Sequence, residues 1–166
     1  MMKIKTIRAN KYNYDSKHLR SRKSIIAIVI HYTANDGDTA ENNGFYFRRE
    51  RVGASANFFI DREGIIVRSV YVRRVAYAVE TKGLNFKGQY RNYNTVSIEL
   101  CDFNKNKEIS EKQMESLRYL VKRIMKHCPN CKEIIRHFDV NGKQCPVNLI
   151  NENKWKMFRK EVLYGR

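Results

Sequence analysis

Short apolar runs alternate along this chain with stretches of helical periodicity. The run SIIAIVIHY, residues 24–32, is almost continuously apolar and rich in Ile and Val, which predicts a central strand covered on both faces. Four further strands are predicted at residues 54–61, 65–70, 95–101 and 133–136. The segment DREG that follows residue 60 predicts a hairpin turn between the first two of these, with Gly64 at a positive φ.

Helical periodicity is clearest from residue 110 onward. Ser110 and Gln113 match a capping box, and the helix is expected to end near residue 128, before Pro129. One apolar stripe runs along it at Met114, Leu117, Val121 and Ile124. A short helix is predicted from about Thr39, and a final helix from about Asn151. The buried residues expected in the final helix are Trp155, Phe158 and Val162.

Strands that alternate with helices indicate an α/β fold, here a single domain with a central mixed β-sheet flanked by helices. Residues 1–24 are polar and basic, and we expect them to form an arm packed on a domain of residues 25–166. Residues 80–94 are polar and predict a long loop, which in a compact domain is often functional. Residues 137–147 are also predicted to be a loop.

The charge is unusual, because 33 Lys and Arg against 17 Asp and Glu leave a net charge of +16. Such a field attracts polyanions, although it also serves solubility. The basic residues are dispersed along the sequence, and no helix-turn-helix, zinc-finger or RNA-binding pattern is present, so no nucleic-acid partner is expected. No apolar run approaches the roughly 20 residues of a membrane span.

The start of the chain has no apolar core of the kind found in secretory signals, which predicts synthesis in a cytoplasm without a signal peptide. In that compartment the four Cys residues are expected to be thiols or metal ligands. Cys128 and Cys131 are interpreted as two ordinary thiols in the turn that ends the long helix. Cys101 follows position 99 by two residues and is expected to face the same side of its strand.

Two His residues lie at predicted strand ends. His31 closes the most apolar strand, His137 follows the strand at 133–136, and Cys145 comes eight residues later on a loop that can fold back. Two imidazoles and a thiolate suit zinc, and three protein ligands leave a fourth position for water, as in catalytic sites. From the spacing alone, a hydrogen-bonded structural His remains the commoner interpretation.

Four segments occur in an order that is specific: IAIVIHYTA, SANFFIDREG, NTVSIEL and RHFDVNGKQCP. Together they resemble the zinc N-acetylmuramoyl-L-alanine amidases of the phage-lysozyme type, a family that includes the peptidoglycan recognition proteins. The resemblance covers roughly residues 25–163 and implies an amidase catalytic domain with a Zn²⁺ site at the strand ends. The ligands that it implies are His31, His137 and Cys145, and it adds Glu99 and Lys143 as candidate catalytic residues.

The resemblance implies hydrolysis of the amide bond between N-acetylmuramic acid and L-alanine of the peptidoglycan stem peptide, and hence cell-wall lysis. Glu99 would act as general base and Lys143 would stabilise the oxyanion. Glu99 could instead orient a His ligand, and Lys143 could be a surface lysine. The main alternative is a non-catalytic peptidoglycan-binding module of the same fold, but the intact ligand set favours an enzyme.

Substrate-binding candidates flank the first ligand and the hairpin, namely Tyr32, Thr33, Asn35, Tyr46 and Asn57. The chain departs from the family pattern at Ala56, at Asn57 and at the segment YAVE of residues 77–80, positions that line the groove in relatives. An amidase without a signal peptide resembles a phage or prophage endolysin, which implies a bacteriolytic, antimicrobial activity that acts on the wall after release. Peptidoglycan is then the partner, with anionic wall polymers as a use for the charge, and a monomer is expected.

Overall fold

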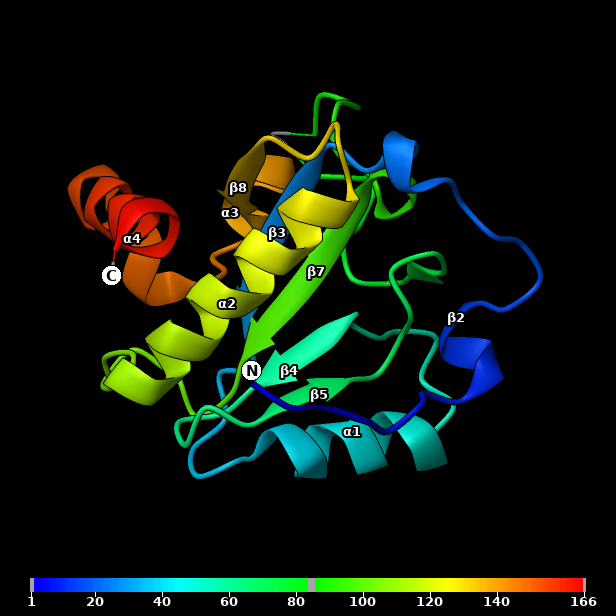
Figure 1. Cartoon of the computed structure of the whole chain (residues 1–166), viewed down its shortest axis with the longest axis horizontal. Coiled ribbons are helices and arrows are strands. Elements are labelled where there is room, and N and C mark those ends of the chain that lie inside the picture. Colours follow the sequence, from blue (N-terminus) through cyan, green and yellow to red (C-terminus); the bar gives the residue numbers. More distant parts are fainter. Residues whose placement is uncertain (1, 84–85, 166) are drawn as a thin grey trace.

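The computed structural model describes residues 2–83 and 86–165, which form a six-stranded mixed sheet with helices on both faces (Figure 1). The strand order is β1-β5-β4-β7-β3-β8, and β5 runs antiparallel to β4. The strands of this sheet are β1 (Ile4–Thr6), β3 (Ala27–Tyr32), β4 (Phe58–Ile60), β5 (Ile66–Arg68), β7 (Thr95–Leu100) and β8 (Glu133–Arg136). A separate antiparallel pair consists of β2 (Tyr14–Asp15) and β6 (Val75–Ala76).

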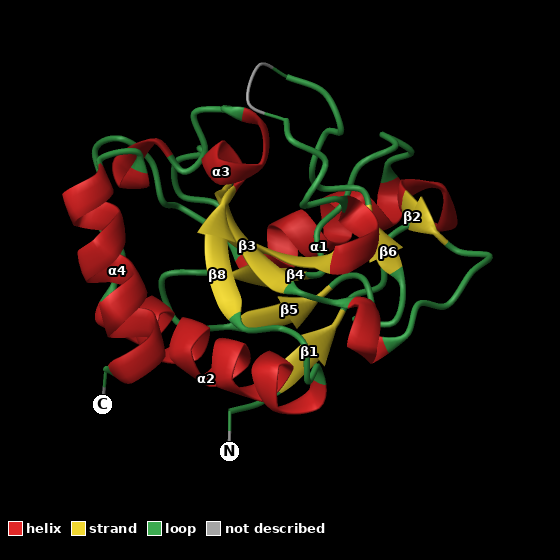
Figure 2. Cartoon of the chain, turned by 90° about the horizontal axis from the view of Figure 1, so that it is seen from above, coloured by secondary structure: helices red, strands yellow, loops and turns green. Residues whose placement is uncertain are grey.

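The helices are α1 (Ala40–Arg49), α2 (Glu111–His127), α3 (His137–Asn141) and α4 (Glu152–Tyr164). In two perpendicular views α2 covers one face of the sheet, and α1 and α3 lie on the opposite face (Figures 1 and 2). The helix α4 packs beside α2, and the two share one hydrophobic core. No helix in the described ranges is both long and apolar enough to cross a bilayer.

Side-chain alternation along β3 divides the two faces. Ile28 and Ile30 belong to the core beneath α2, whereas Ala27 and Val29 belong to a smaller core on the opposite face. Because the period is two, His31 falls on the face that α1 and α3 cover. Near-complete burial of β3 on both sides confirms the prediction of a central strand.

The predicted α/β fold is confirmed, as are the β4–β5 hairpin, the positive φ of 79° at Gly64 and the helix starts at Thr39, Ser110 and Asn151. The predicted capping box is only half formed. The Ser110 side chain accepts a hydrogen bond from the backbone N–H of Gln113. The Gln113 side chain is fully buried and donates instead to the carbonyls of residues 60 and 101, at 2.8 and 2.9 Å.

Two segments predicted to lack regular structure contain some. Residues 4–6, within the predicted basic arm, form β1 and pair in parallel with β5, so that part of the arm is an edge strand of the sheet. Residues 137–141, predicted as loop, form α3, whose first turn is capped by Asp139 accepting from the backbone N–H of Arg136 at 2.8 Å. Gly142 ends the helix in the left-handed region, with φ at 87°.

Arg20 anchors the N-terminal segment to the domain. Its side chain is 1% exposed, and its guanidinium donates to the carbonyls of residues 72, 92, 93 and 95 at 2.7–2.8 Å. Buried acceptors that lose their donor carry the full cost of desolvation. This single side chain therefore ties the chain before β3 to the start of β7.

Replacing Arg20 by Met is expected to lower the free energy of unfolding by roughly 3 kcal/mol, because the carbonyls of residues 72, 92, 93 and 95 lose a charged donor. Urea denaturation followed by far-ultraviolet circular dichroism measures the change. The matched control is Lys23→Met, an exposed position where a shift within about 0.5 kcal/mol is expected. Equal stability of the two variants would contradict the anchoring role.

Candidate metal centre

The parallel pairing of β3 with β7 places two polar side chains next to one another. His31 is opposite Glu99 in the register, and by the alternation along β3 both are on the face of the sheet away from α2. Ser97 lies on the same face of β7, and its hydroxyl is 3.1 Å from Nε2 of His31. That contact orients the imidazole and leaves Nδ1 as the nitrogen available to a ligand.

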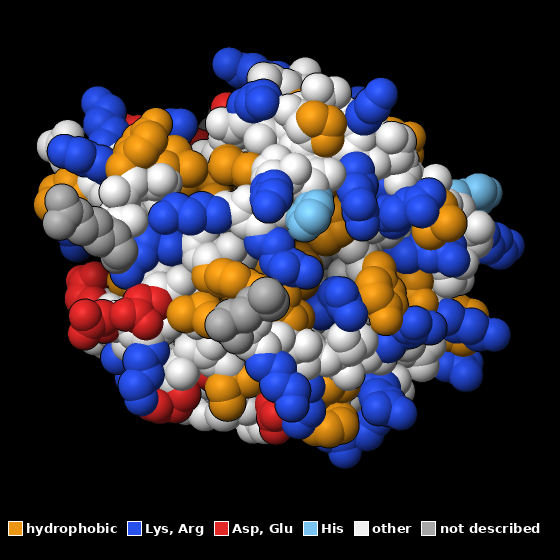
Figure 3. Space-filling model, viewed as in Figure 1, with side chains coloured by type: hydrophobic (Ala, Val, Ile, Leu, Met, Phe, Trp, Pro, Cys, Tyr) orange, Lys and Arg blue, Asp and Glu red, His pale blue; other side chains and the backbone are white. Residues whose placement is uncertain are grey.

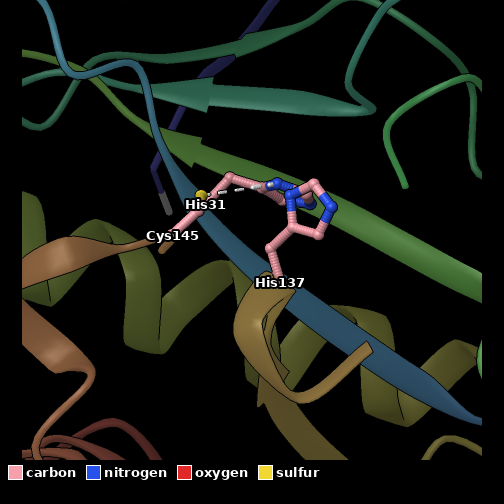
Figure 4. A group of neighbouring side chains, drawn as sticks. All are labelled: His31, His137 and Cys145. Carbon is pink, nitrogen blue, oxygen red and sulfur yellow. Dashed lines mark hydrogen bonds between the residues drawn. The ribbon is translucent and has the colours of Figure 1, made fainter. Parts of the chain in front are cut away.

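The other two side chains come from beyond β8. His137 is the first residue of α3, and its ring meets that of His31 edge to face with centroids 4.7 Å apart. The chain then folds back, with the backbone N–H of Phe138 donating to the carbonyl of Cys145 at 3.0 Å. This return places the Cys145 sulfur 3.9 Å from Nδ1 of His31 (Figure 4).

One ligand atom each from His31, His137 and Cys145 lies within 4.8 Å of the other two, and all three residues are buried. Zinc–nitrogen and zinc–sulfur bonds of about 2.1 and 2.3 Å at a tetrahedral angle hold their ligand atoms about 3.6 Å apart. Nδ1 of His137 is buried without a hydrogen-bond partner in the described ranges, and such orphaned atoms are rare. The donor set therefore fits a metal ion.

Burial sets the protonation of these groups. It lowers the pKa of His137 to about 4, with the positive charge of Lys143 adding to the effect. It also lowers the pKa of His31 well below its ordinary value, helped by the neighbouring His137 and Lys143. Both imidazoles are thus neutral at pH 7, which is the form that binds metal. Burial, followed by the nearby Glu99, raises the pKa of Cys145 to about 12, so its thiol must lose a proton when a metal binds.

Glu99 lies at the rim of this group. One carboxylate oxygen is 3.9 Å from Nδ1 of His31, and the other is buried without a partner among the described residues. Burial raises the pKa of Glu99 to about 8, the charge of Lys143 lowers it and Asp38 raises it. Lys143 is exposed on the loop after α3. A cation bound beside the carboxylate would shift its pKa down again.

A pocket of about 540 Å³ opens beside Glu99. It is lined by four of the five predicted substrate-binding residues, Tyr32, Thr33, Asn35 and Tyr46. Asn57 does not reach it. That residue is 1% exposed, and its amide accepts from the backbone N–H of Ser97 and donates to the carbonyl of Val70. Its side chain links β4 to β7, so the predicted substrate contact of Asn57 does not fit its position.

Two supporting residues were not predicted from the sequence. Ser97 orients His31, and Asn141 lies one helical turn after His137 with its amide 3.4 Å from Nε2 of that ring. The Asn141 side-chain oxygen also accepts from the backbone N–H of Lys143 at 3.1 Å. Residues two apart on a strand share a face, so Ser97 could have been predicted from Glu99. Residues four apart on a helix also share a face, so Asn141 could have been predicted from His137 if residues 137–141 had been predicted to be helical.

The other cysteines are separate from this group. Cys101, Cys128 and Cys131 are buried free thiols, and Cys101 accepts a weak hydrogen bond from Asn43 at 3.5 Å. As predicted, Cys128 and Cys131 lie in the turn that ends α2, where the N–H of Cys131 donates to the carbonyl of Cys128. Neither belongs to the metal-binding cluster found among the described residues.

Comparison with known proteins identifies relatives over nearly the whole chain. The family described as N-acetylmuramoyl-L-alanine amidase matches residues 21–148. The N-acetylmuramoyl-L-alanine amidase CwlL of Bacillus licheniformis is 28% identical over 166 residues, which cover 94% of this chain and 45% of that protein. The amidase BlyA of Bacillus subtilis (strain 168) is 27% identical over 172 residues, with coverage of 94% and 45%. The chain thus spans about half the length of these curated relatives.

Solved structures share the fold. The structure of PlyL matches with a TM-score of 0.79 at 22% identity, covering 99% of each chain. The N-acetylmuramoyl-L-alanine amidase LysC from Clostridium intestinale URNW matches with a TM-score of 0.69 at 20% identity, covering 98% of each chain. At these identities the similarity establishes the fold alone.

Metal binding is expected to require Cys145 and to strengthen with pH. Between pH 6 and 8 both candidate His ligands are neutral, whereas the thiol proton must leave, so zinc affinity should rise about ten-fold per pH unit. Cobalt(II) should give a sulfur-to-metal charge-transfer absorption in the native protein. The band should vanish in Cys145→Ala and persist in Cys131→Ala, a buried thiol outside the group. A band that survives in Cys145→Ala would contradict the ligand assignment.

Proposed function

The chain belongs to the N-acetylmuramoyl-L-alanine amidase family, and on that premise we propose that it hydrolyses the amide bond between N-acetylmuramic acid and L-alanine in peptidoglycan. The observation that carries the proposal is the buried group of two neutral imidazoles and a thiol beside a carboxyl of raised pKa. A module that only binds peptidoglycan has no need of an orphaned buried nitrogen and a titratable acid at one point. The complete set favours catalysis.

In this proposal His31, His137 and Cys145 hold zinc. When bound, zinc supplies a Lewis acid that polarises a carbonyl and lowers the pKa of water toward about 7. Ser97 and Asn141 orient the two His ligands, because each contacts the second nitrogen of one imidazole. The resulting geometry keeps both rings directed at one point before any ion arrives.

Glu99 is the proposed general base. A carboxyl whose pKa is near the working pH can accept a proton from the attacking water and return it to the departing L-alanine nitrogen. Its oxygen at 3.9 Å from the ligand nitrogen of His31 is close enough to act on water at the same point. The other oxygen has no protein partner in the described ranges and is free to accept a hydrogen bond from water.

Lys143 is the proposed stabiliser of the oxyanion. Its charge already acts on His31, His137 and Glu99, so its ammonium group lies within electrostatic range of the reacting centre. The backbone bond from Lys143 to Asn141 fixes the start of the loop that carries it. As negative charge develops on the carbonyl oxygen, an ammonium group held nearby lowers the energy of the transition state more than that of the substrate.

The pocket beside Glu99 is the proposed substrate groove. Tyr32, Thr33, Asn35 and Tyr46 offer aromatic faces, a hydroxyl and an amide to sugar and peptide groups. The Thr33 hydroxyl is buried without a partner in the described part of the chain, which suits a hydrogen bond to substrate. We further propose the setting of an endolysin that acts on the wall as a monomer, where the net charge of +16 attracts anionic wall polymers.

Digestion of purified peptidoglycan is expected to release new N-terminal L-alanine without new reducing sugar ends, as read by mass spectrometry and end-group assay. Removal of metal by a chelator should abolish the release, and added zinc should restore it. His137→Ala should remain inactive under all conditions, whereas Cys131→Ala should match the unmodified protein. New reducing ends would indicate a glycosidase, and lysis by metal-free His137→Ala would contradict zinc-dependent hydrolysis.

Glu99→Gln is expected to lower kcat by about 10²–10⁴ with little change in KM, because proton transfer is lost while binding is kept. Zinc content should stay the same. Lys143→Met should lower kcat by roughly 10² and move the pH–rate profile to higher pH, because the charge that lowers the pKa of Glu99 is lost. Glu115→Gln, an exposed carboxyl on α2, is the matched control. If Glu99→Gln loses zinc in proportion to activity, Glu99 positions His31 and is not the base.

A further inference from the structure

A pocket of about 520 Å³ lies on the α2 face of the molecule, between the second half of α2, the strands β4 and β5, and the segments 19–22 and 71–74. We call it the arginine pocket, because six arginines line it: Arg8, Arg22, Arg68, Arg73, Arg74 and Arg123. They are spread from residue 8 to residue 123 in sequence, and the fold brings them together. Its apolar floor includes Phe58, Leu120 and Ile124.

The arginine pocket has no counter-charge of its own. None of its lining residues is Asp or Glu, and none of its six guanidinium groups forms an ion pair in the ranges that the structure describes. Elsewhere Arg62, Arg118 and Arg136 each have a carboxylate partner. On this face Lys and Arg predominate, and the visible Asp and Glu lie around the periphery, mainly at the left and lower edges (Figure 3). Gathered cations without a partner favour an anionic ligand.

Part of the pocket is held in place before any ligand binds. Arg68 donates to the hydroxyl of Thr6 at 2.8 Å, and its guanidinium lies 4.2 Å from the centroid of the Tyr71 ring. Its Nε is buried without a partner among the described residues. Arg74 is bound to the carbonyls of Ser16 and His18. These two arginines form a fixed base, and a charged donor fixed over an apolar floor binds anions more strongly than a solvated one.

The other side of the pocket is adaptable. Arg22, Arg73 and Arg123 are exposed, and their guanidinium groups make no hydrogen bond or ion pair among the described residues. The arginine pocket also faces away from the metal centre. Phe58 and Ile28 belong to the core under α2, whereas His31, like Val29, is on the opposite face of the sheet. A ligand in the arginine pocket would leave the substrate groove free.

We propose that the arginine pocket binds a phosphodiester-linked anionic polymer of the cell wall and holds the enzyme on its substrate while the opposite face cuts. Guanidinium forks match phosphate oxygens in pairs, and several around one hollow suit successive phosphates of a flexible chain. The hollow shape does not fit a flat lipid surface. The Tyr71 ring, which could stack on a nucleobase, is already covered by Arg8 and Arg68 at 5.1 and 4.2 Å. The choice of a wall polymer rests on the proposed function.

The test compares two triple variants that lose equal charge. Arg22→Gln, Arg73→Gln and Arg123→Gln together remove the exposed side of the pocket, and Lys154→Gln, Lys156→Gln and Lys160→Gln remove three exposed charges from α4. Sedimentation with purified walls, and with walls stripped of phosphodiester polymers by hydrofluoric acid, measures binding. We expect the pocket variant to bind intact walls roughly ten-fold or more weakly, and the α4 variant to change less than two-fold. Stripped walls should bind all three proteins equally weakly.

Binding of soluble poly(glycerol phosphate), measured by titration calorimetry, keeps the test independent of amidase activity. The pocket variant should lose this binding and still cleave a soluble muramyl peptide at the unmodified rate, because its changes lie on the other face. Equal losses in both triple variants, or undiminished binding to stripped walls, would overturn the proposal. The proposal would also be overturned if the pocket variant lost binding only to duplex DNA or only to anionic vesicles and kept its binding to the polymer. A protein that binds the polymer but cleaves nothing would refute the proposed amidase and leave the arginine pocket standing.

Discussion

The parallel alignment of β3 with β7 and β8 is the constraint on which the site depends. Parallel strands end at the same edge of a sheet, so the residues that follow them lie close together in space even though they are far apart in the sequence. The register places His31 opposite Glu99, and β8 ends one residue before His137. A slip of one residue would turn His31 into the core beneath α2 and direct Ile30 toward the metal centre. The apolar residues of β3, buried on both faces, fix that register.

Burial of polar groups at this edge of the sheet costs stability, but it also sets the protonation states that metal binding needs. Two imidazoles and a thiol are withdrawn from water beside the partly exposed carboxyl of Glu99, and their burial keeps the imidazoles neutral and the thiol protonated. Ser97 and Asn141 satisfy one nitrogen of each ring, and the remaining nitrogens are left for a ligand. The stability that the site lacks is supplied elsewhere, by the continuous core of β3, β7 and α2 and by buried anchors such as Arg20.

The sequence predicted those elements whose pattern is long enough to read. The β3 run, the α2 stripe and the α4 residues around Trp155 have clear periodicity, and all three form as expected. The candidate ligands at 31, 137 and 145 were predicted only from the four ordered segments, because the spacing of two His and a Cys is not specific. The strand β1 and the helix α3 were missed since three and five residues carry too little periodicity. Asp139 and Gly142 were the available signals for α3.

Tertiary context decided the rest. Asn57 follows the strand pattern at a groove position of the family, yet its amide completes the bonding between β4 and β7, which no local signal reveals. The arginines at 8, 22, 68, 73, 74 and 123 are dispersed in the sequence, which argued against a focused anion site. Four separate parts of the chain, around residues 8, 22, 68–74 and 123, bring them to one pocket. Contacts between distant segments are set by topology, and the sequence pattern specifies topology only indirectly.

The positive charge of the chain has two opposite effects on the candidate metal centre. Burial is the main cause that lowers the pKa of His31 and His137 at the candidate metal centre, and the positive field, to which Lys143 contributes locally, acts in the same direction. The same field opposes the arrival of a dication. The thiolate of Cys145 and the carboxylate of Glu99 resolve the conflict, since their two negative charges would cancel those of a bound zinc ion. A neutral centre can then remain buried within a strongly basic protein.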